Sequence, residues 1–237
     1  MALASRRRGL LRFSWTQNIL SNSNCHILMK TLMVCCAHND DHILGAGGTL
    51  YNYHKKGWKT LNVVWSFGES SHPWLKNKVT RDMRFSEAKK ADRLLGIEKT
   101  FYLGASEGKF KEADDALHKL QRIMSIARPS MILTHSPSDP HPDHKAVFHY
   151  VIEITEKIGL DCDIYCFDVW NFFNVRKPVP RMVEDISMSF QHKLRAFRLH
   201  KSQRMTMLTM IPAMFARALS GGLLFGYKYA EVFEKAR

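Results

Sequence analysis

The sequence lacks any apolar run that approaches the roughly 20 consecutive residues a helix needs to cross a bilayer. Its five cysteines, at positions 25, 35, 36, 162 and 166, show neither disulfide nor zinc-knuckle spacing. Internal repeats and low-complexity linkers are also missing. These absences predict no transmembrane segment, reduced thiols in a cytoplasmic protein and a single domain over residues 29–237.

Acidic residues are missing from the first 30 positions, whose basic residues are Arg6, Arg7, Arg8, Arg12 and Lys30. They contribute +5 to a net charge of +13, and the remaining +8 is interpreted as spread along the chain. A generally basic surface is therefore expected rather than a nucleic-acid site. Residues 1–28 have the composition of a transit peptide. A disordered extension or a translation start at Met29 is the favoured explanation.

Strand-like and helix-like segments alternate along most of the chain. Strands are predicted at 32–36, 60–66, 100–103, 130–134 and 163–167, and helices at 48–56, 79–95, 113–127, 145–157 and 189–202. This order predicts an α/β fold with a mostly parallel sheet and helices on both faces. Pro212 is expected to break any helix in 205–227, a segment that either covers the active site, forms an oligomer contact or touches a membrane surface.

Two polar clusters follow predicted strands. His38, Asp40 and Asp41 come directly after the first strand, and a similar cluster with His141 and His144 follows the strand at 130–134. Ligands in such sheets bind just past the carboxyl ends of the strands. Histidine and aspartate are common ligands of catalytic zinc, which takes three protein ligands and keeps one open position. A divalent-metal site is therefore expected, with either His144 or His141 as its third ligand.

The same clusters carry a resemblance to a known family. Ala37-His38-Asn39-Asp40-Asp41-His42 and His141-Pro142-Asp143-His144 resemble the two motifs of the PIG-L/LmbE-like zinc-dependent de-N-acetylases. Shorter matches follow the same order, at Arg84–Ala88, Asp185–Ser187, His200–Gln203 and Tyr229–Phe233. The resemblance extends over roughly 29–233. It implies an LmbE-like, Rossmann-like three-layer fold and hydrolysis of an N-acetylglucosamine-type conjugate by metal-activated water.

The resemblance also implies roles for particular residues. His38, Asp41 and His144 would bind one Zn²⁺ per chain, with Fe²⁺ or Co²⁺ as substitutes. Asp40 would be the general base, and His141 would donate a hydrogen bond to the tetrahedral oxyanion.

Further positions are assigned to the surroundings of this site. Asp143 and His135 are candidates to orient a ligand, while Arg84 and Glu107 are candidate substrate contacts. Asn39 stands where the family has Pro. His42 stands where it has Glu, and it is interpreted as a spectator, a substrate contact or an extra ligand.

Other functions remain open from the sequence. The positive charge suits a nucleic-acid or anionic-lipid binder with a degenerate metal site, and the metal motifs suit a metallohydrolase of another bond. The expected partner is a small N-acetylated sugar conjugate, and homo-oligomers are compatible with the sequence.

Overall fold

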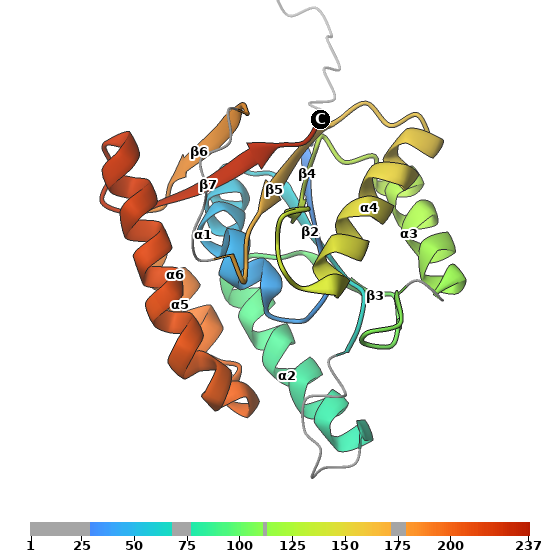
Figure 1. Ribbon diagram of the computed structural model, residues 1–237, viewed down its shortest axis with the longest axis horizontal. Coiled ribbons are helices and arrows are strands. Elements are labelled where there is room, and N and C mark those ends of the chain that lie inside the picture. Colours follow the sequence, from blue (N-terminus) through green and yellow to red (C-terminus); the bar gives the residue numbers. More distant parts are fainter. Residues whose placement is uncertain (1–28, 68–76, 111–112, 172–178) are drawn as a thin grey trace, which may run out of the picture.

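A computed structural model describes residues 29–67, 77–110, 113–171 and 179–237 (Figure 1). The predicted extension, residues 1–28, lies outside the described residues. Its separation from a single domain over 29–237 therefore stays a prediction.

The centre of the molecule is a seven-stranded sheet in the order β3-β2-β1-β4-β5-β7-β6. Its strands are β1 (Thr31–Cys36), β2 (Lys59–Val64), β3 (Lys99–Tyr102), β4 (Met131–His135), β5 (Asp163–Phe167), β6 (Arg181–Asp185) and β7 (Ala230–Lys235). The first five strands in this order are parallel, and β7 runs antiparallel to both β5 and β6. The predicted mostly parallel α/β sheet is confirmed.

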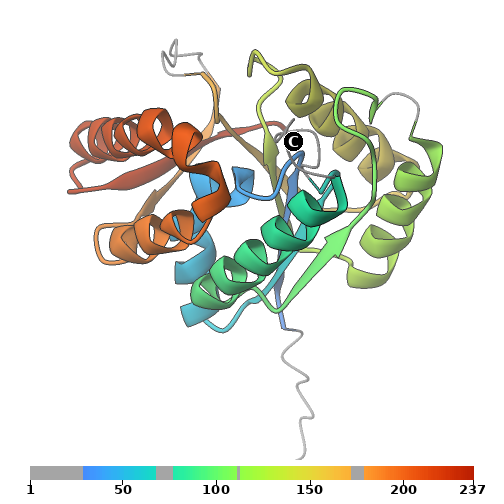
Figure 2. The same ribbon diagram turned by 90° about the horizontal axis from the view of Figure 1, so that it is seen from below.

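Helices cover both faces of this sheet (Figures 1 and 2). They are α1 (Asp41–Lys55), α2 (Asn77–Leu95), α3 (Asp114–Ala127), α4 (Pro142–Lys157), α5 (Phe190–Arg198) and α6 (Arg204–Phe225), with a short 3₁₀ helix at Lys201–Gln203. Helices α3 and α4 cover one face, and the other four cover the opposite face. The predicted three-layer arrangement is confirmed.

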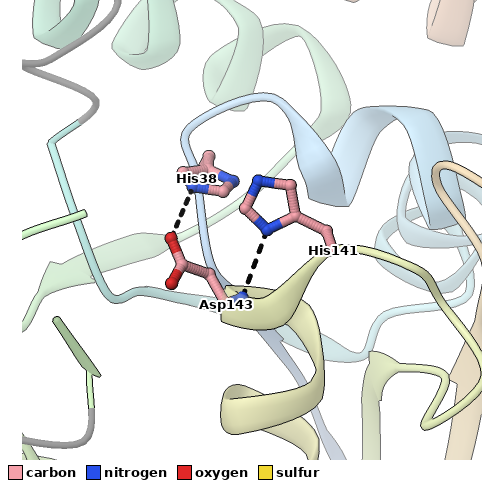
Figure 3. Close-up of side chains that lie close together, drawn as sticks. All are labelled: His38, His141 and Asp143. Atoms are coloured by element: carbon pink, nitrogen blue, oxygen red, sulfur yellow. Dashed lines mark hydrogen bonds and ion pairs between the residues drawn. The ribbon is translucent and has the colours of Figure 1, made fainter. Parts of the chain in front are cut away.

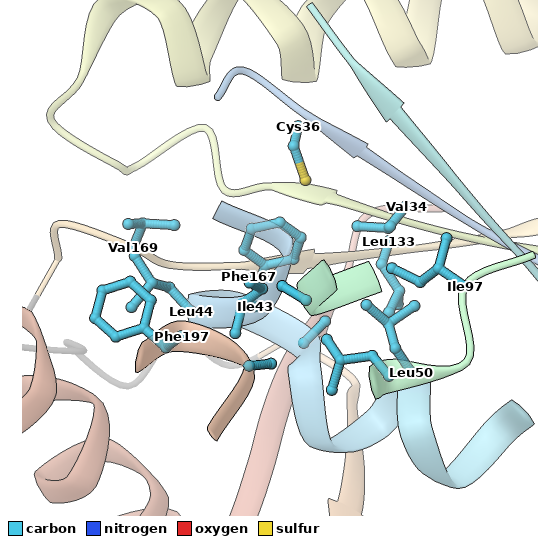
Figure 4. Close-up of a cluster of buried hydrophobic side chains, with 14 of the residues drawn as sticks. Val34, Cys36, Ile43, Leu44, Leu50, Ile97, Leu133, Phe167, Val169 and Phe197 are labelled. Atoms are coloured by element: carbon cyan, nitrogen blue, oxygen red, sulfur yellow. The ribbon is translucent and has the colours of Figure 1, made fainter. Parts of the chain in front are cut away.

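The two faces of β1 contribute to two separate hydrophobic cores, because successive side chains of a strand point to opposite sides. Leu32, Val34 and Cys36 lie in the core beneath α1 and α2 (Figure 4). Met33 and Cys35 lie in the core beneath α3 and α4. Since β1 is buried throughout, it fixes the loop that follows it in a rigid position.

The helix predicted at 48–56 begins seven residues earlier, at Asp41. The glycine-rich sequence of Gly45–Gly48 is typical of a turn, yet these residues lie inside α1. A Cβ atom at Gly48 would stand 2.5 Å from Cγ2 of Ile186, and one at Gly45 would enter the ring of Phe167. These glycines therefore allow close packing against α1 and do not form a turn.

The last third of the chain differs most from expectation. Helix α6 continues through Pro212, so the predicted break is wrong. Pro212 is exposed, and the carbonyl that it leaves without an N–H partner, on Leu208, belongs to an exposed residue.

Within α6, residues Met207–Phe225 are long and apolar enough to cross a membrane by length and composition. The expectation that no run approaches such a length is therefore wrong for this helix.

Candidate metal centre

The candidate site lies where the sheet order reverses. The chain leaves β1 toward β2 on one side, while β4 lies on the other side of β1. Loops that follow two such strands separate at the carboxyl edge of the sheet and leave a crevice between them. The loop after β1 carries His38 and Asp40 and leads to Asp41, and the loop after β4 leads to His141 and His144.

The carboxylate of Asp41 is the centre of this crevice. Asp41 is the first residue of α1, and its Oδ2 accepts a hydrogen bond of 2.8 Å from the backbone N–H of His38. The same oxygen lies 3.3 Å from Nδ1 of His38 and 3.4 Å from Nε2 of His144. The fold therefore brings the three predicted metal ligands together.

These atoms fit a divalent metal. Ligand atoms at roughly 2.0–2.2 Å from a tetrahedral zinc ion stand about 3.3–3.5 Å apart, which matches both distances to Asp41. Among the described residues, Nε2 of His144 is buried and has no hydrogen-bond partner. A buried polar nitrogen without a partner is costly. Metal coordination would remove that cost.

Two further carboxylates lie beside the ring nitrogens of His38 and His144 that are not directed at Asp41. Asp143 Oδ2 lies 3.5 Å from Nε2 of His38 (Figure 3), as expected for an orienting group. Asp139 Oδ1 lies 3.1 Å from Nδ1 of His144. Asp139 was given no role from the sequence. Its oxygens also accept hydrogen bonds from the backbone N–H groups of Val169 and Trp170.

The described residues include two other clusters with metal-ligating side chains. In the first, Asp139 is already engaged by His144 and by three backbone N–H groups. Its third member, His135, accepts the N–H of Ala37 at Nε2. Burial and the neighbouring His144 lower the pKa of His135 to about 4, so it is neutral. His135 thus packs against His144, with ring centroids 3.8 Å apart, and supports it.

The other cluster contains His141, which differs from His144 in its hydrogen bonding. Its Nδ1 accepts the backbone N–H of Asp143 at 3.2 Å (Figure 3). A neutral imidazole that accepts at Nδ1 carries its proton on Nε2. Burial, together with His144 and His38, lowers the pKa of His141, which favours this neutral form. The ring therefore offers a hydrogen-bond donor to the cavity.

The pKa values of the two histidines in the metal-free cluster reflect the negative charge of Asp41 between them. Burial alone would lower the pKa of His38 and His144, but the Asp41 carboxylate outweighs it and raises them to about 10 and about 9. Burial would raise the pKa of Asp41, yet His144, His135 and His38 hold it well below its usual range. The site therefore attracts positive charge, either protons or a metal ion.

A cavity of about 150 Å³ opens beside the cluster. The predicted catalytic and substrate-contact residues all line it, together with four residues from the last third of the chain. The complete lining is His38, Asp40, Asp41, Leu44, Arg84, Glu107, His141, Val169, Trp170, Gln203 and Met210. Asp40 is only 7% exposed and lies next to Asp41, the candidate metal ligand.

Gln203 connects two of these residues and was missed as a site residue. With its amide oriented to satisfy both neighbours, its nitrogen donates to Asp40 Oδ2 at 3.0 Å and its oxygen accepts from Arg84. Arg84 therefore acts on the Asp40 side of the cavity. Glu107 also lines the cavity, and it accepts a hydrogen bond of 3.4 Å from Ser66.

His42 does not line the cavity. Its Nε2 lies 2.9 Å from Asp92 of α2, and its side chain is fully buried between the two helices. The same carboxylate accepts a hydrogen bond from Thr100. In this structure His42 joins α1 to α2 and is separate from the cavity and from the candidate metal ligands. His200 is also buried and does not line the cavity.

Comparison with known proteins finds similar sequences among curated enzymes. A probable N-acetyl-alpha-D-glucosaminyl L-malate deacetylase 2 of Bacillus cereus is 27% identical over 189 residues, which cover 76% of this chain and 86% of that protein. The 4-oxalmesaconate hydratase of Pseudomonas putida is 29% identical over 141 residues, 56% of this chain and 54% of that protein. The chain thus matches about half the length of that relative.

The fold is shared with solved structures. N,N'-diacetylchitobiose deacetylase from Pyrococcus horikoshii superposes with a TM-score of 0.75 at 22% identity, over 91% of this chain and 87% of that chain. The sequence profile of the PIG-L family, described as GlcNAc-PI de-N-acetylase, matches residues 33–155. This match spans just over half of the chain and includes both metal motifs, so the chain belongs to the PIG-L family.

Proposed function

We propose that this protein is a zinc-dependent hydrolase that removes the acetyl group from an N-acetylglucosamine-type conjugate in the cytoplasm. The observation that carries the proposal is the convergence of His38, Asp41 and His144 beside a small cavity that also holds Asp40 and His141. The relatives named as deacetylases of acetylated sugars support the choice of substrate.

The chemistry divides between the cluster and its neighbours. A metal held by His38, Asp41 and His144 would polarise an amide carbonyl and lower the pKa of water. Asp40 takes a proton from the attacking water as the C–O bond forms. It then passes that proton to the nitrogen as the C–N bond breaks. His141 donates its Nε2 proton in a hydrogen bond to the developing oxyanion.

The remaining lining residues would position the sugar. Gln203 occupies one oxygen of Asp40, which leaves the other for water. Arg84 and Glu107 offer a donor and an acceptor for hydroxyl groups, and Trp170, 38% exposed, offers an apolar surface for a ring. Holding the amide in one orientation is itself a large part of such catalysis.

A hydratase activity is the second candidate, because one relative is a 4-oxalmesaconate hydratase. The extent of the match disfavours it. The similar region covers 54% of the hydratase, whereas it covers 86% of the glucosaminyl-malate deacetylase.

The test is release of acetate from a panel of N-acetylated glucosamine conjugates by zinc-loaded protein. About one metal per chain is expected by elemental analysis. The double variant His38→Ala, His144→Ala should lose both metal and turnover. Full metal content in that variant would overturn the ligand assignment, and consumption of 4-oxalmesaconate without acetate release would favour the hydratase.

A further inference from the structure

Helix α6 is apolar on two opposite faces. Its buried face packs on β7 and the adjoining core through Met210, Met214 and Ala218. Its exposed face carries an apolar stripe, spaced as one side of a helix requires: Leu208, Pro212, Phe215, Leu219 and Leu223. A surface helix normally places polar residues on its outer side. It is therefore unusual that this apolar stripe faces solvent.

The stripe is large and continuous. Leu208 and Leu223 are 71% and 73% exposed, and Leu224 and Phe225 extend the exposed apolar surface to the end of the helix. From Leu208 to Leu223 a helix rises about 22 Å. Helix α6 lies at the outer edge of the molecule in both views (Figures 1 and 2), so no other described element covers this face. Apolar surfaces of this extent generally mark an interaction site.

Positive charge concentrates around the same helix. Residues 186–230 contain no Asp or Glu and seven basic residues: Lys193, Arg195, Arg198, Lys201, Arg204, Arg217 and Lys228. Of these, Lys193 is buried in an ion pair with Glu231, and Arg217 donates to the backbone carbonyls of Asp168 and Val169. Most of the +8 that was interpreted as spread along the chain therefore lies here, which corrects that interpretation. Lys201 precedes α6 and Lys228 follows it, and both are exposed. Arg195 and Arg198 are exposed on the neighbouring α5, whose Phe190 ring contacts Phe215 of α6.

We propose that α6 docks this protein onto an anionic lipid bilayer. The apolar stripe enters the boundary between headgroups and acyl chains, and the flanking lysines bind anionic headgroups. The opposite face of α6 is part of the core. The helix therefore lies in the plane of the membrane surface and does not cross it.

A second copy of this chain fits the stripe less well. Two α6 helices packed face to face would bring basic residues of both copies together with no carboxylate from residues 186–230 to balance them. Like charges disfavour such an interface, whereas an anionic bilayer satisfies both the apolar stripe and the positive charge. Nucleic acid would match the charge but leave the stripe exposed to water.

The docked orientation would also bring the cavity close to the membrane. Met210 of α6 and Gln203, just before it, line the cavity. The docking proposal rests on α6 alone and stands whether or not the proposed deacetylase activity is correct.

The experiment is co-sedimentation of the full chain with vesicles of phosphatidylcholine alone or mixed with phosphatidylglycerol. Binding is expected with the mixed vesicles and should weaken as salt rises. The double variant Leu219→Glu, Leu223→Glu should bind at least about tenfold more weakly, because carboxylates would enter the apolar boundary. Lys201→Ala and Lys228→Ala should each weaken binding about fivefold.

The matched control is Ile126→Glu, at a position 75% exposed on α3, across the sheet from α6. It should bind vesicles like the unaltered chain. Every variant is expected to fold because the substituted side chains are exposed, and circular dichroism melting checks this. Absence of binding to the mixed vesicles, or unchanged binding by the Leu219→Glu, Leu223→Glu variant, would overturn the proposal. A dimer that this variant dissociates, without any vesicle binding, would assign the stripe to a second copy.

Discussion

Two adjacent aspartates, Asp40 and Asp41, carry different parts of the proposed chemistry. Asp41 faces three histidine nitrogens, whereas Asp40 faces the cavity and Gln203. Asp40→Asn should keep the metal and lose about 10²–10⁴-fold in turnover, because it removes the base and keeps the shape. Asp41→Asn should weaken metal binding itself. Elemental analysis and acetate release on both variants test this, and near-normal turnover of Asp40→Asn would place the base elsewhere.

His141 and His144 share one motif but differ in their hydrogen bonds. His141→Ala removes the Nε2 donor and leaves the three ligand atoms in place. It should retain the metal and lose about 10²–10³-fold in turnover. His144→Ala serves as the comparison and should purify with little metal. A metal-free His141→Ala protein would instead exchange the two roles.

Metal binding should depend on pH with a defined sign. The pKa values of His38 and His144 in the metal-free protein are about 10 and about 9, so both rings hold protons at pH 7. A metal must displace these protons, and its affinity should therefore rise with pH up to about pH 10, where His38 also loses its proton, and fall in acid. Calorimetry of zinc binding in buffers of different ionisation enthalpy counts the released protons. Binding at pH 7 without proton release would contradict the prediction.

The sequence locates some site residues better than others. His38, Asp41 and His144 could be found because each stands directly after a strand or at the start of the next helix, where local pattern is informative. Asp139 and Gln203 could not. Their contacts to Val169 and to Asp40 join positions far apart in the chain, and such contacts follow from tertiary packing alone.

Helix α1 depends on glycines that the sequence pattern misrepresents as a turn. A Cβ at Gly48 would meet Cγ2 and Cβ of Ile186 at 2.5 and 2.7 Å, whereas the nearest atom to one at Gly47 would be Cγ of Lys193, at 3.1 Å. Gly48→Ala should therefore lower the free energy of unfolding by about 1–3 kcal/mol. Gly47→Ala, the matched control, should change it much less. Chemical denaturation measures both changes. If Gly48→Ala changed the free energy of unfolding as little as Gly47→Ala, Ile186 would be shown to move aside without cost.

Strands and helices were predictable where their periodicity is simple. The parallel strands β1 to β5 were each expected within one or two residues, and all except the partly exposed β3 are largely buried. β6 and β7 were not expected as strands, since β6 is half-buried at four successive positions and lacks alternation. The exposed residues of helix α6 are as apolar as its buried ones, so its sequence shows no amphipathic period. Only the folded structure distinguishes the buried face from the exposed face.

The whole molecule divides its charge unevenly. The described residues outside 186–230 are close to balanced, while the segment that forms α5 and α6 is strongly basic. The candidate metal centre, by contrast, gathers carboxylates at the carboxyl edge of the sheet. The α5–α6 face is thus suited to contact an anionic surface, while the carboxylates of the metal centre are suited to hold a cation.

The first 28 residues should be dispensable for the fold. The central strand β1 begins at Thr31, and Lys30 already accepts the backbone N–H of Lys59 at 3.0 Å. A chain that starts at Met29 keeps every described contact of the sheet. It should melt within about 2 °C of the full chain and release acetate at the same rate, because a ΔΔG near zero gives no shift in Tm.

A cut inside β1 gives the matched comparison. A chain that starts at Met33 loses Thr31 and Leu32, which pair with Lys59 and Thr60 of β2. Leu32 is fully buried, and its removal from a central strand should cost about 2–5 kcal/mol or abolish folding. Differential scanning calorimetry on the three chains separates the outcomes. If the Met29 chain melted far below the full chain, residues 1–28 would contribute to the folded core, and the domain boundary at Met29 would have to move toward the N-terminus.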